Sequence, residues 1–348
     1  MNMKQGFAAE ERALLHGQQI DASTVDSMQG WFPVAIAAET NSLWWRYLGE
    51  KRFTESFFQD SLSAQTYAER QVCHTPLARL DALSHGMQSI VPTAFIFHVS
   101  RCGSTLLTQM LASLQQCVVL SEPPVLDAFF RHYHHQPDMP GALDLLRQLV
   151  AVLGQKRHVA ETHFFIKFDS WHMPWLAFIR EAFPDTPFIF LYREPEAVLA
   201  SHRRQRGPQM IPGLLDTTRL QVHCQHLPVA DMDGYAAAVL AALFAAGLEQ
   251  VQASRLHLLN YSQLPAILWD QLFALFGLDC DEAQLSSLKA RCTLHSKHRH
   301  MPYQGDPPAG ERQLAQWEQW EQLEQLNRDA VKQCKKIYDE LEKLRSET

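Results

Sequence analysis

Short apolar runs alternate with helical patterns through the middle of the chain. The runs span residues 94–99, 164–168, 187–192 and 256–261, and the longest helical pattern between them covers residues 235–254. Apolar runs of this length between helices are typical of strands that are buried on both faces of a parallel sheet. The pattern therefore predicts an α/β fold, a three-layer α/β/α domain with a central, mostly parallel sheet and right-handed crossovers.

The two ends of the chain carry other patterns. We interpret residues 1–90 as a mixed accessory segment of helix and loop, followed by the main domain at 91–310 and one long polar C-terminal helix at 311–348. The accessory segment contains an aromatic cluster that we expect to serve mainly in packing and partly as the wall of a substrate pocket. Its members are Trp44, Trp45, Tyr47, Phe53, Phe57 and Phe58.

The predicted C-terminal helix has an apolar stripe. Trp317, Trp320, Leu323 and Leu326 recur at three-residue steps, and Ile337, Leu341 and Leu344 continue the stripe. A helix with one apolar face either packs on its own domain or joins a partner helix. Both interpretations stay open here, so a homo-oligomer formed through this helix is one alternative.

Composition narrows the class of protein. The chain has 348 residues, of which 46% are hydrophobic and 20% are charged, and its net charge of −7 provides no basic field for nucleic acid. The 7 cysteines form no Cys-x-x-Cys pair, which disfavours a zinc site or a disulfide framework. No apolar leader is visible, and the apolar stretch at 235–247 is shorter than a bilayer span. These features predict a cytoplasmic protein that contacts neither membrane nor nucleic acid.

A small-residue turn follows the first apolar run. Residues 100–105, Ser-Arg-Cys-Gly-Ser-Thr, join the predicted strand to a helix, whose N-terminus offers unpaired N–H groups to an anion. Gly103 permits close backbone approach, and Ser104 and Thr105 add hydroxyl donors. Arg101 adds a permanent cation. The chain lacks the Lys-Ser/Thr pair of a Walker A loop, which disfavours a nucleotide triphosphatase.

A second strand, turn and helix cover residues 190–201, Phe-Leu-Tyr-Arg-Glu-Pro-Glu-Ala-Val-Leu-Ala-Ser. Arg193 stands at the end of the strand, and Pro195 suits the first turn of the helix. Ser201 follows Arg193 by eight residues, a little over two helical turns. Arg193 and Ser201 can serve one phosphate if the strand end and the helix face converge. Otherwise Arg193 is a surface cation and Ser201 a core-facing hydroxyl.

Four segments in this order resemble the sulfotransferase superfamily that uses 3′-phosphoadenosine 5′-phosphosulfate (PAPS). Residues 100–107 are similar to its 5′-phosphosulfate loop in the bacterial Arg-x-Gly-Ser-Thr form, and residues 192–201 resemble its 3′-phosphate motif. Residues 183–189, Phe-Pro-Asp-Thr-Pro-Phe-Ile, look like the lead into that motif. Residues 259–264, Leu-Asn-Tyr-Ser-Gln-Leu, resemble a later strand and turn. The resemblance covers residues 92–305 and implies a P-loop-like version of the α/β fold.

The resemblance implies sulfuryl transfer from PAPS to a hydroxyl or amine of an unidentified acceptor, a small molecule, saccharide or peptide. Displacement would be in line, with 3′-phosphoadenosine 5′-phosphate (PAP) as product and no metal. Arg101 would stabilise charge on the bridging oxygen, and Arg193 and Ser201 would hold the 3′-phosphate. Lys297 or Arg299 would complete that site, in a looser match. The 5′-phosphosulfate would be held by Cys102, Gly103, Ser104, Thr105 and Leu106.

The general base has several candidates. Glu122, in Leu-Ser-Glu-Pro-Pro, stands where the resemblance to tyrosylprotein and bacterial sulfotransferases implies the catalytic carboxylate. Asp169 stands where many cytosolic members carry a catalytic His, so a His base is disfavoured, although His163 and His172 are near in sequence. We favour Glu122 and keep the other three as alternatives. Lys167 either assists the sulfate or is solvated.

Two polar clusters have simpler interpretations. His132-Tyr-His-His135 has no carboxylate or cysteine at a convincing ligand spacing, so we interpret it as solvated rather than as a metal site. Arg203-Arg-Gln-Arg206 either contacts an anionic group of donor or acceptor or is solvated. Two functions other than catalysis of sulfuryl transfer remain as alternatives. One is a non-catalytic protein that binds 3′-phosphoadenosine nucleotides, and the other is a P-loop kinase-like transferase.

Overall fold

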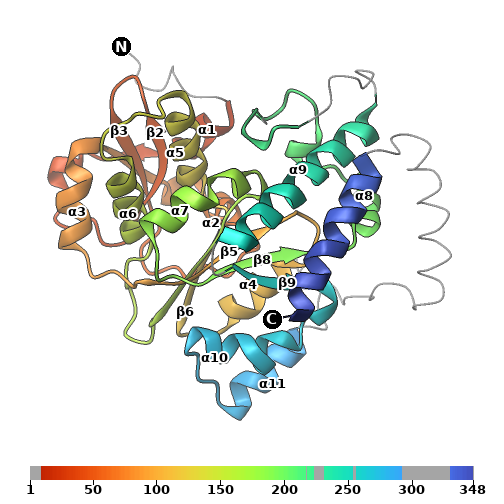
Figure 1. Ribbon diagram of the computed structural model, residues 1–348. Helices are drawn as coiled ribbons and strands as arrows, with labels where there is room; N and C mark the ends of the chain where they lie inside the picture. The colour runs from red at the N-terminus through yellow and green to blue at the C-terminus, as the bar shows by residue number, and fades with distance from the viewer. Residues whose placement is uncertain (1–8, 217, 223–230, 254–255, 292–329, 348) are drawn as a thin grey trace. The chain divides into compact units, whose positions relative to one another are not determined.

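The computed structural model describes residues 9–216, 218–222, 231–253, 256–291 and 330–347 (Figure 1). The chain divides into two compact units. The first unit comprises the chain up to Phe95 together with Thr108–Phe168 and Phe178–Thr186. The second unit comprises Ile96–Leu107, Asp169–Ala177 and the chain from Pro187 onward.

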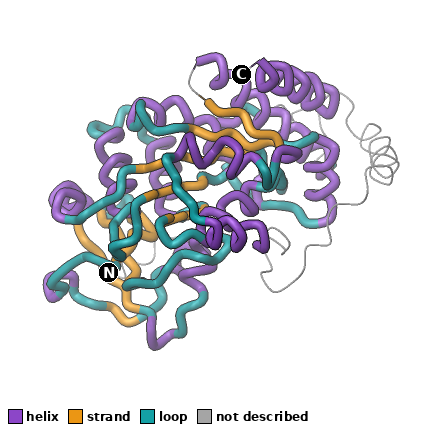
Figure 2. Tube along the Cα trace, turned by 90° about the horizontal axis from the view of Figure 1, so that it is seen from below, coloured by secondary structure: helices purple, strands orange, loops and turns teal. Residues whose placement is uncertain are grey.

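A five-stranded sheet forms the centre of the α/β fold, and its strands are among those drawn in orange in Figure 2. The strands are β5 (Pro92–His98), β6 (Cys117–Ser121), β7 (His163–Lys167), β8 (Phe188–Tyr192) and β9 (Leu256–Asn260), in the order β6-β7-β5-β8-β9. β6 pairs with β7 and β8 with β9, both in parallel. The predicted α/β class with a central parallel sheet is therefore confirmed, and β6 is a strand that the sequence interpretation did not include.

Helices connect these strands. Those of the main α/β region are α4 (Ser104–Ser113), α5 (Pro124–His135), α6 (Ala142–Leu153), α7 (Leu176–Ala182), α8 (Pro195–Arg204), α9 (Met232–Ala253), α10 (Phe273–Phe276) and α11 (Glu282–Arg291). A π-helical stretch, Leu268–Leu272, leads into α10. Short 3-10 helices lie at Ala22–Thr24, Tyr67–Glu69, Leu77–Arg79, Ser170–Trp175, Pro208–Met210, Thr218–Leu220 and Tyr261–Gln263.

The first unit contains a second sheet, and here the expectation of helix and loop was wrong. Its strands are β1 (Gln18–Gln19), β2 (Trp31–Ala37), β3 (Ser42–Tyr47) and β4 (Gln71–Pro76), in the order β1-β4-β3-β2. The helices of this segment are α1 (Ala9–Leu14), α2 (Phe58–Ser63) and α3 (Leu80–Gly86). Every residue of β2 is buried, so the strand shows none of the apolar–polar alternation that marks a half-exposed strand.

Arg46 explains why β3 was also missed. A charged residue normally marks an exposed position, yet Arg46 is only 2% exposed. Its guanidinium donates to the carbonyl oxygens of Leu14 and Leu62 at 2.7 and 3.3 Å, and burial lowers its pKa to about 10. The aromatic cluster packs around this sheet, since Trp44, Trp45 and Phe58 are at most 2% exposed, which confirms its packing role.

The helix α9 is longer than the apolar stretch at 235–247. Met232–Val251 is long and apolar enough to cross a membrane by length and composition, so the expectation that this stretch is too short was wrong. In the structure 61% of this segment is buried. Val239, Leu243 and Phe244 are fully buried within the second unit, so its apolar residues serve as core.

Residues 330–347 form a helix (dark blue in Figure 1). Its apolar face packs within the second unit, with Ile337 8% and Leu341 0% exposed. The Tyr338 ring centroid lies 5.9 Å from that of Tyr192 on β8. Within the described residues, the interpretation of a helix docked on its own domain is therefore confirmed. The stripe of Trp317, Trp320, Leu323 and Leu326 lies outside the described residues, and the homo-oligomer stays a prediction.

Candidate active site

The turn after β5 has an unusual backbone. Ser100, Arg101 and Gly103 have φ angles of 72°, 52° and 87°. Non-glycine residues rarely adopt this left-handed region, and such strained conformations cluster at functional sites. Two hydrogen bonds fix the start of the turn. Ser100 N donates to Nδ1 of His98 at 3.0 Å, and Val99 N donates to the Leu191 carbonyl at 3.2 Å. Turns of this kind gather backbone N–H groups into a concavity that suits an anion.

Gly103 is required at its position for two reasons. Its φ is positive, and a Cβ added there would lie 2.7 Å from Cδ2 of Tyr261 and 2.8 Å from Cδ1 of Leu264. The turn therefore lies directly against the Tyr261 ring. α4 begins at the next residue, Ser104, which is 4% exposed. The Cys102 thiol points inward and donates to the Leu191 carbonyl at 3.2 Å, so its side chain anchors the turn to β8.

Arg193 contacts the same tyrosine. Its guanidinium carbon lies 4.0 Å from the Tyr261 ring centroid, which is cation–π geometry. Nε of Arg193 lies 3.7 Å from a carboxylate oxygen of Glu194, and the Arg193 side chain is 16% exposed. Since the Tyr261 ring lies against both Arg193 and Gly103, the structure brings the two sequence motifs together within the second unit.

The carboxyl-terminal half of α8 also approaches the turn. Arg101 donates to the Gln205 carbonyl at 2.6 Å. Burial lowers the pKa of Arg101, and the nearby Arg204 cation lowers it further. The repulsion between these two cations is of the kind that a bound anion would relieve. Ser201 lies on the same helix and is half-buried.

The first unit carries the other candidate pair, Glu122 and Lys167. Glu122 directly follows β6 with a φ of 58°, and its N–H donates to the carbonyl of Lys167, the last residue of β7, at 2.7 Å. Nζ of Lys167 lies 2.8 Å from Oε1 of Glu122, and the two side chains are 1% and 22% exposed. Lys167 also lies 4.6 Å from the centroid of the Phe57 ring. Lys167 is therefore a buried cation paired with Glu122, and the solvated alternative was wrong.

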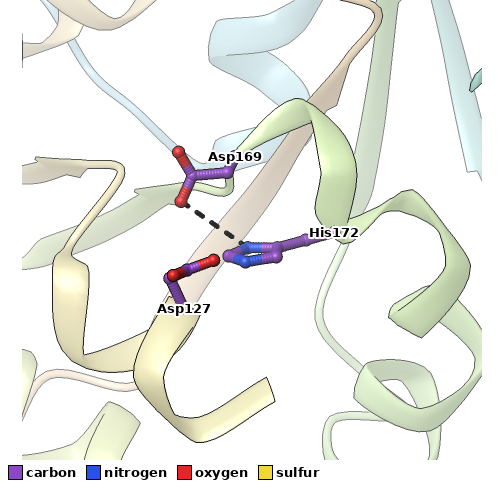
Figure 3. A group of neighbouring side chains, drawn as sticks. All are labelled: Asp127, Asp169 and His172. Atoms are coloured by element: carbon purple, nitrogen blue, oxygen red, sulfur yellow. Dashed lines mark ion pairs between the residues drawn. The ribbon is translucent and has the colours of Figure 1, made fainter. Parts of the chain in front are cut away.

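Asp169 and His172 form a second acid–base pair, in the second unit (Figure 3). Asp169 precedes the 3-10 helix Ser170–Trp175, and its Oδ2 lies 3.8 Å from Nδ1 of His172. Both side chains are buried, at 8% and 2% exposed. His163 begins β7, so about four residue steps of ~3.3 Å separate it from Lys167 at the other end of the strand. His163 stays an alternative base from the sequence alone.

Comparison with known proteins decides the family. The profile of the sulfotransferase family matches residues 92–276, more than half of the chain. The chain belongs to the sulfotransferase family. The matched region holds the turn at 100–105, Glu122, Lys167, Arg193 and Tyr261. Comparison with the curated proteins found no match.

Several solved sulfotransferase structures are similar to this chain. STF9 from Mycobacterium avium is 13% identical over 61% of this chain and 70% of its own, with a TM-score of 0.42. The sulfotransferase domain from the curacin biosynthetic pathway is 20% identical over 63% and 80%, with a TM-score of 0.39. Mouse SULT7A1, complexed with PAP, is 10% identical over 75% and 92%, with a TM-score of 0.34.

The remaining candidate residues lie in three places. Lys297 and Arg299 lie outside the described residues. His132, His134 and His135 lie in the last turn of α5. In the basic cluster at 203–206, Arg203 and Arg204 are exposed, as the solvated interpretation expects, and Arg203 and Arg206 both pair with Asp233 at the start of α9.

Two contacts of the candidate site were missing from the sequence prediction. Tyr261 was quoted only within the segment 259–264, and its aromatic ring beside a conformationally special glycine was the available signal. Phe57 was assigned to packing, and no local pattern links it to Lys167 at the end of a distant strand. Both contacts depend on tertiary structure rather than on sequence spacing.

Proposed function

We propose that the protein transfers a sulfuryl group from PAPS to a hydroxyl or amine of an acceptor. The observation that carries this proposal is the Tyr261 ring, which lies against Gly103 of the first motif and under Arg193 of the second. Two anion sites on one tyrosine suit a nucleotide that carries phosphate at both its 5′ and 3′ ends. A donor without a 3′-phosphate, such as ATP, would leave Arg193 without that phosphate to bind.

The 3′-phosphate would be bound by Arg193 and Ser201. Arg193 is fixed by the aromatic face beneath it and has a carboxylate, Glu194, 3.7 Å away. A dianionic phosphate can compete with that carboxylate because charge-assisted bonds from a guanidinium fork are strong. Lys297 and Arg299 stay candidates for the same phosphate from the sequence alone.

The 5′-phosphosulfate would be bound by the turn at 102–106. The backbone of Cys102 and Gly103, the hydroxyls of Ser104 and Thr105, and the N-terminus of α4 at Leu106 supply donors. Arg101 would neutralise charge that develops on the bridging oxygen as it leaves.

Glu122 is proposed as the general base. The acceptor oxygen or nitrogen would attack the sulfur, the bond from sulfur to the bridging oxygen would break, and PAP would leave with the bonding electrons. The acceptor proton would pass to the Glu122 carboxylate, which is accessible at 22% exposure. Lys167, buried and 2.8 Å away, would orient that carboxylate, and Asp169 is the alternative base.

Nucleotide binding and turnover test the proposal separately. Isothermal titration should give tighter binding of PAP than of AMP, because only PAP presents a 3′-phosphate to Arg193. Equal affinities would refute the assignment of the donor. Sulfate transfer from labelled PAPS, measured over phenols, alcohols, saccharides and peptides, should then identify an acceptor. Selective PAP binding without any turnover would instead favour the non-catalytic alternative.

A further inference from the structure

On the helix at 330–347, the carboxylate of Glu342 accepts hydrogen bonds from three side chains. The Tyr192 hydroxyl donates to Oε1 of Glu342 at 2.5 Å, and Nδ2 of Asn260 donates to the same oxygen at 3.0 Å. Arg345 donates to both carboxylate oxygens, at 3.0 and 2.8 Å. Glu342 is therefore the common acceptor for side chains from two strands and from its own helix.

The two strand residues hold positions next to the donor site. Tyr192 ends β8 and is directly followed by Arg193. Asn260 ends β9 and is directly followed by Tyr261, the residue on which Arg193 stacks. Tyr192 is 0% and Asn260 1% exposed, so each needs a protein partner for its polar group. Glu342 supplies a partner to both.

Asn260 links Glu342 to the turn that contains Tyr261. Its Oδ1 accepts from Ser262 N at 2.9 Å and so caps the turn Tyr261–Gln263. Its Nδ2 donates to the Tyr338 hydroxyl at 3.0 Å as well as to Glu342. The helix therefore binds the Nδ2 end of the Asn260 amide, and the Oδ1 end caps the turn. Tyr261 is the next residue in the chain after Asn260.

We infer that Glu342 is a positioning residue for the 3′-phosphate site, which it serves by holding the ends of β8 and β9 in register so that Arg193 and Tyr261 stay stacked. The inference rests on the proposed function, since it needs a 3′-phosphate to be the ligand of Arg193. Through this contact the helix at 330–347 contributes to nucleotide selection, although Glu342 follows Tyr192 by 150 residues in the sequence.

The test compares Glu342→Ala with Glu340→Ala, which alters an exposed carboxylate on the same helix. Isothermal titration measures the affinities of each variant for PAP and for AMP. Glu342→Ala should weaken PAP about tenfold, the scale for losing a hydrogen bond to a charged group, and should leave AMP nearly unchanged. Glu340→Ala should change neither. Glu342→Gln keeps an acceptor oxygen for Tyr192 and Asn260 and should restore most of the preference for PAP.

The outcomes separate this inference from the proposed function. If the wild-type protein does not prefer PAP to AMP, the proposed function fails and the inference fails with it. If the wild type prefers PAP and Glu342→Ala keeps the same ratio of affinities, the inference alone is overturned, as it is if both nucleotides weaken in parallel. Should Glu342→Ala not fold, Tyr192→Phe removes one hydroxyl and carries the test. A PAP-selective loss of about threefold supports the inference, and an unchanged ratio overturns it.

Discussion

Replacing Gly103 with alanine should damage both stability and nucleotide binding. The position has a φ of 87°, which costs a residue with a Cβ about 1–2 kcal/mol. The new Cβ would also lie 2.7 Å from a Tyr261 ring carbon and 2.8 Å from Leu264, and overpacking of this kind costs about 1–3 kcal/mol. The expected total is about 2–5 kcal/mol of unfolding free energy. Because Tyr261 must shift, its stack with Arg193 should be disturbed and PAP should bind more weakly.

Gly277→Ala is the matched control for this change. Gly277 has a φ of 64°, and apart from its chain neighbours nothing lies within 4 Å of the added Cβ, so it carries the backbone cost without the clash. Urea denaturation should show a loss of about 1–2 kcal/mol for Gly277→Ala and a larger loss for Gly103→Ala. Titration should show weaker PAP binding for Gly103→Ala alone. Equal losses of stability in the two variants, or unchanged PAP affinity in Gly103→Ala, would refute the reasoning.

Three further predictions concern charged groups. Glu122→Gln should lower turnover by about 10²–10⁴-fold while the dissociation constant of PAP stays within twofold, since the general base is lost but the proposed donor contacts are kept; unchanged turnover would transfer the role to Asp169, His163 or His172. Lys167→Met should lower turnover and unfolding free energy together, because it removes a buried partner of Glu122; full activity would contradict an orienting role. Burial raises the pKa of Glu342, but its hydrogen bonds lower it more, so the net pKa lies below 4.5. Its contribution to stability is therefore present above pH 4.5 and lost as pH falls through the lowered pKa, and the stability gap between wild type and Glu342→Gln should shrink in acid. A gap independent of pH would be inconsistent with an ionised Glu342.

The central sheet could be predicted because burial on both faces leaves a continuous apolar run. β5, β7, β8 and β9 all carry this signal and were found. β2 is also buried throughout, but Pro33 interrupts its apolar run, and proline within a run argues against a central strand, so β2 was not recognised. β3 contains Arg46, whose burial depends on carbonyl partners from other elements and cannot be foreseen from its own neighbours.

In the candidate site too, local features could be predicted from the sequence and tertiary contacts could not. The turn at 100–105 and the spacing of Arg193 and Ser201 are local, so sequence was enough to propose them. The contacts of Tyr261 with Gly103 and Arg193 depend on which strand lies beside β8 in the sheet, and this is a property of topology. The role of Glu342 was harder to foresee, because Tyr192 and Asn260 lie far from it in the sequence and meet it through the packing of the helix at 330–347.

The most direct measurement is the affinity of Arg193→Ala for PAP and for AMP, set beside the wild type by isothermal titration. The account predicts that PAP binding weakens by roughly 2–3 kcal/mol, the cost of truncating a charged hydrogen-bonding partner, while AMP binding scarcely changes. If PAP and AMP weaken to the same extent, Arg193 does not bind a 3′-phosphate, and the assignment of PAPS as donor is contradicted.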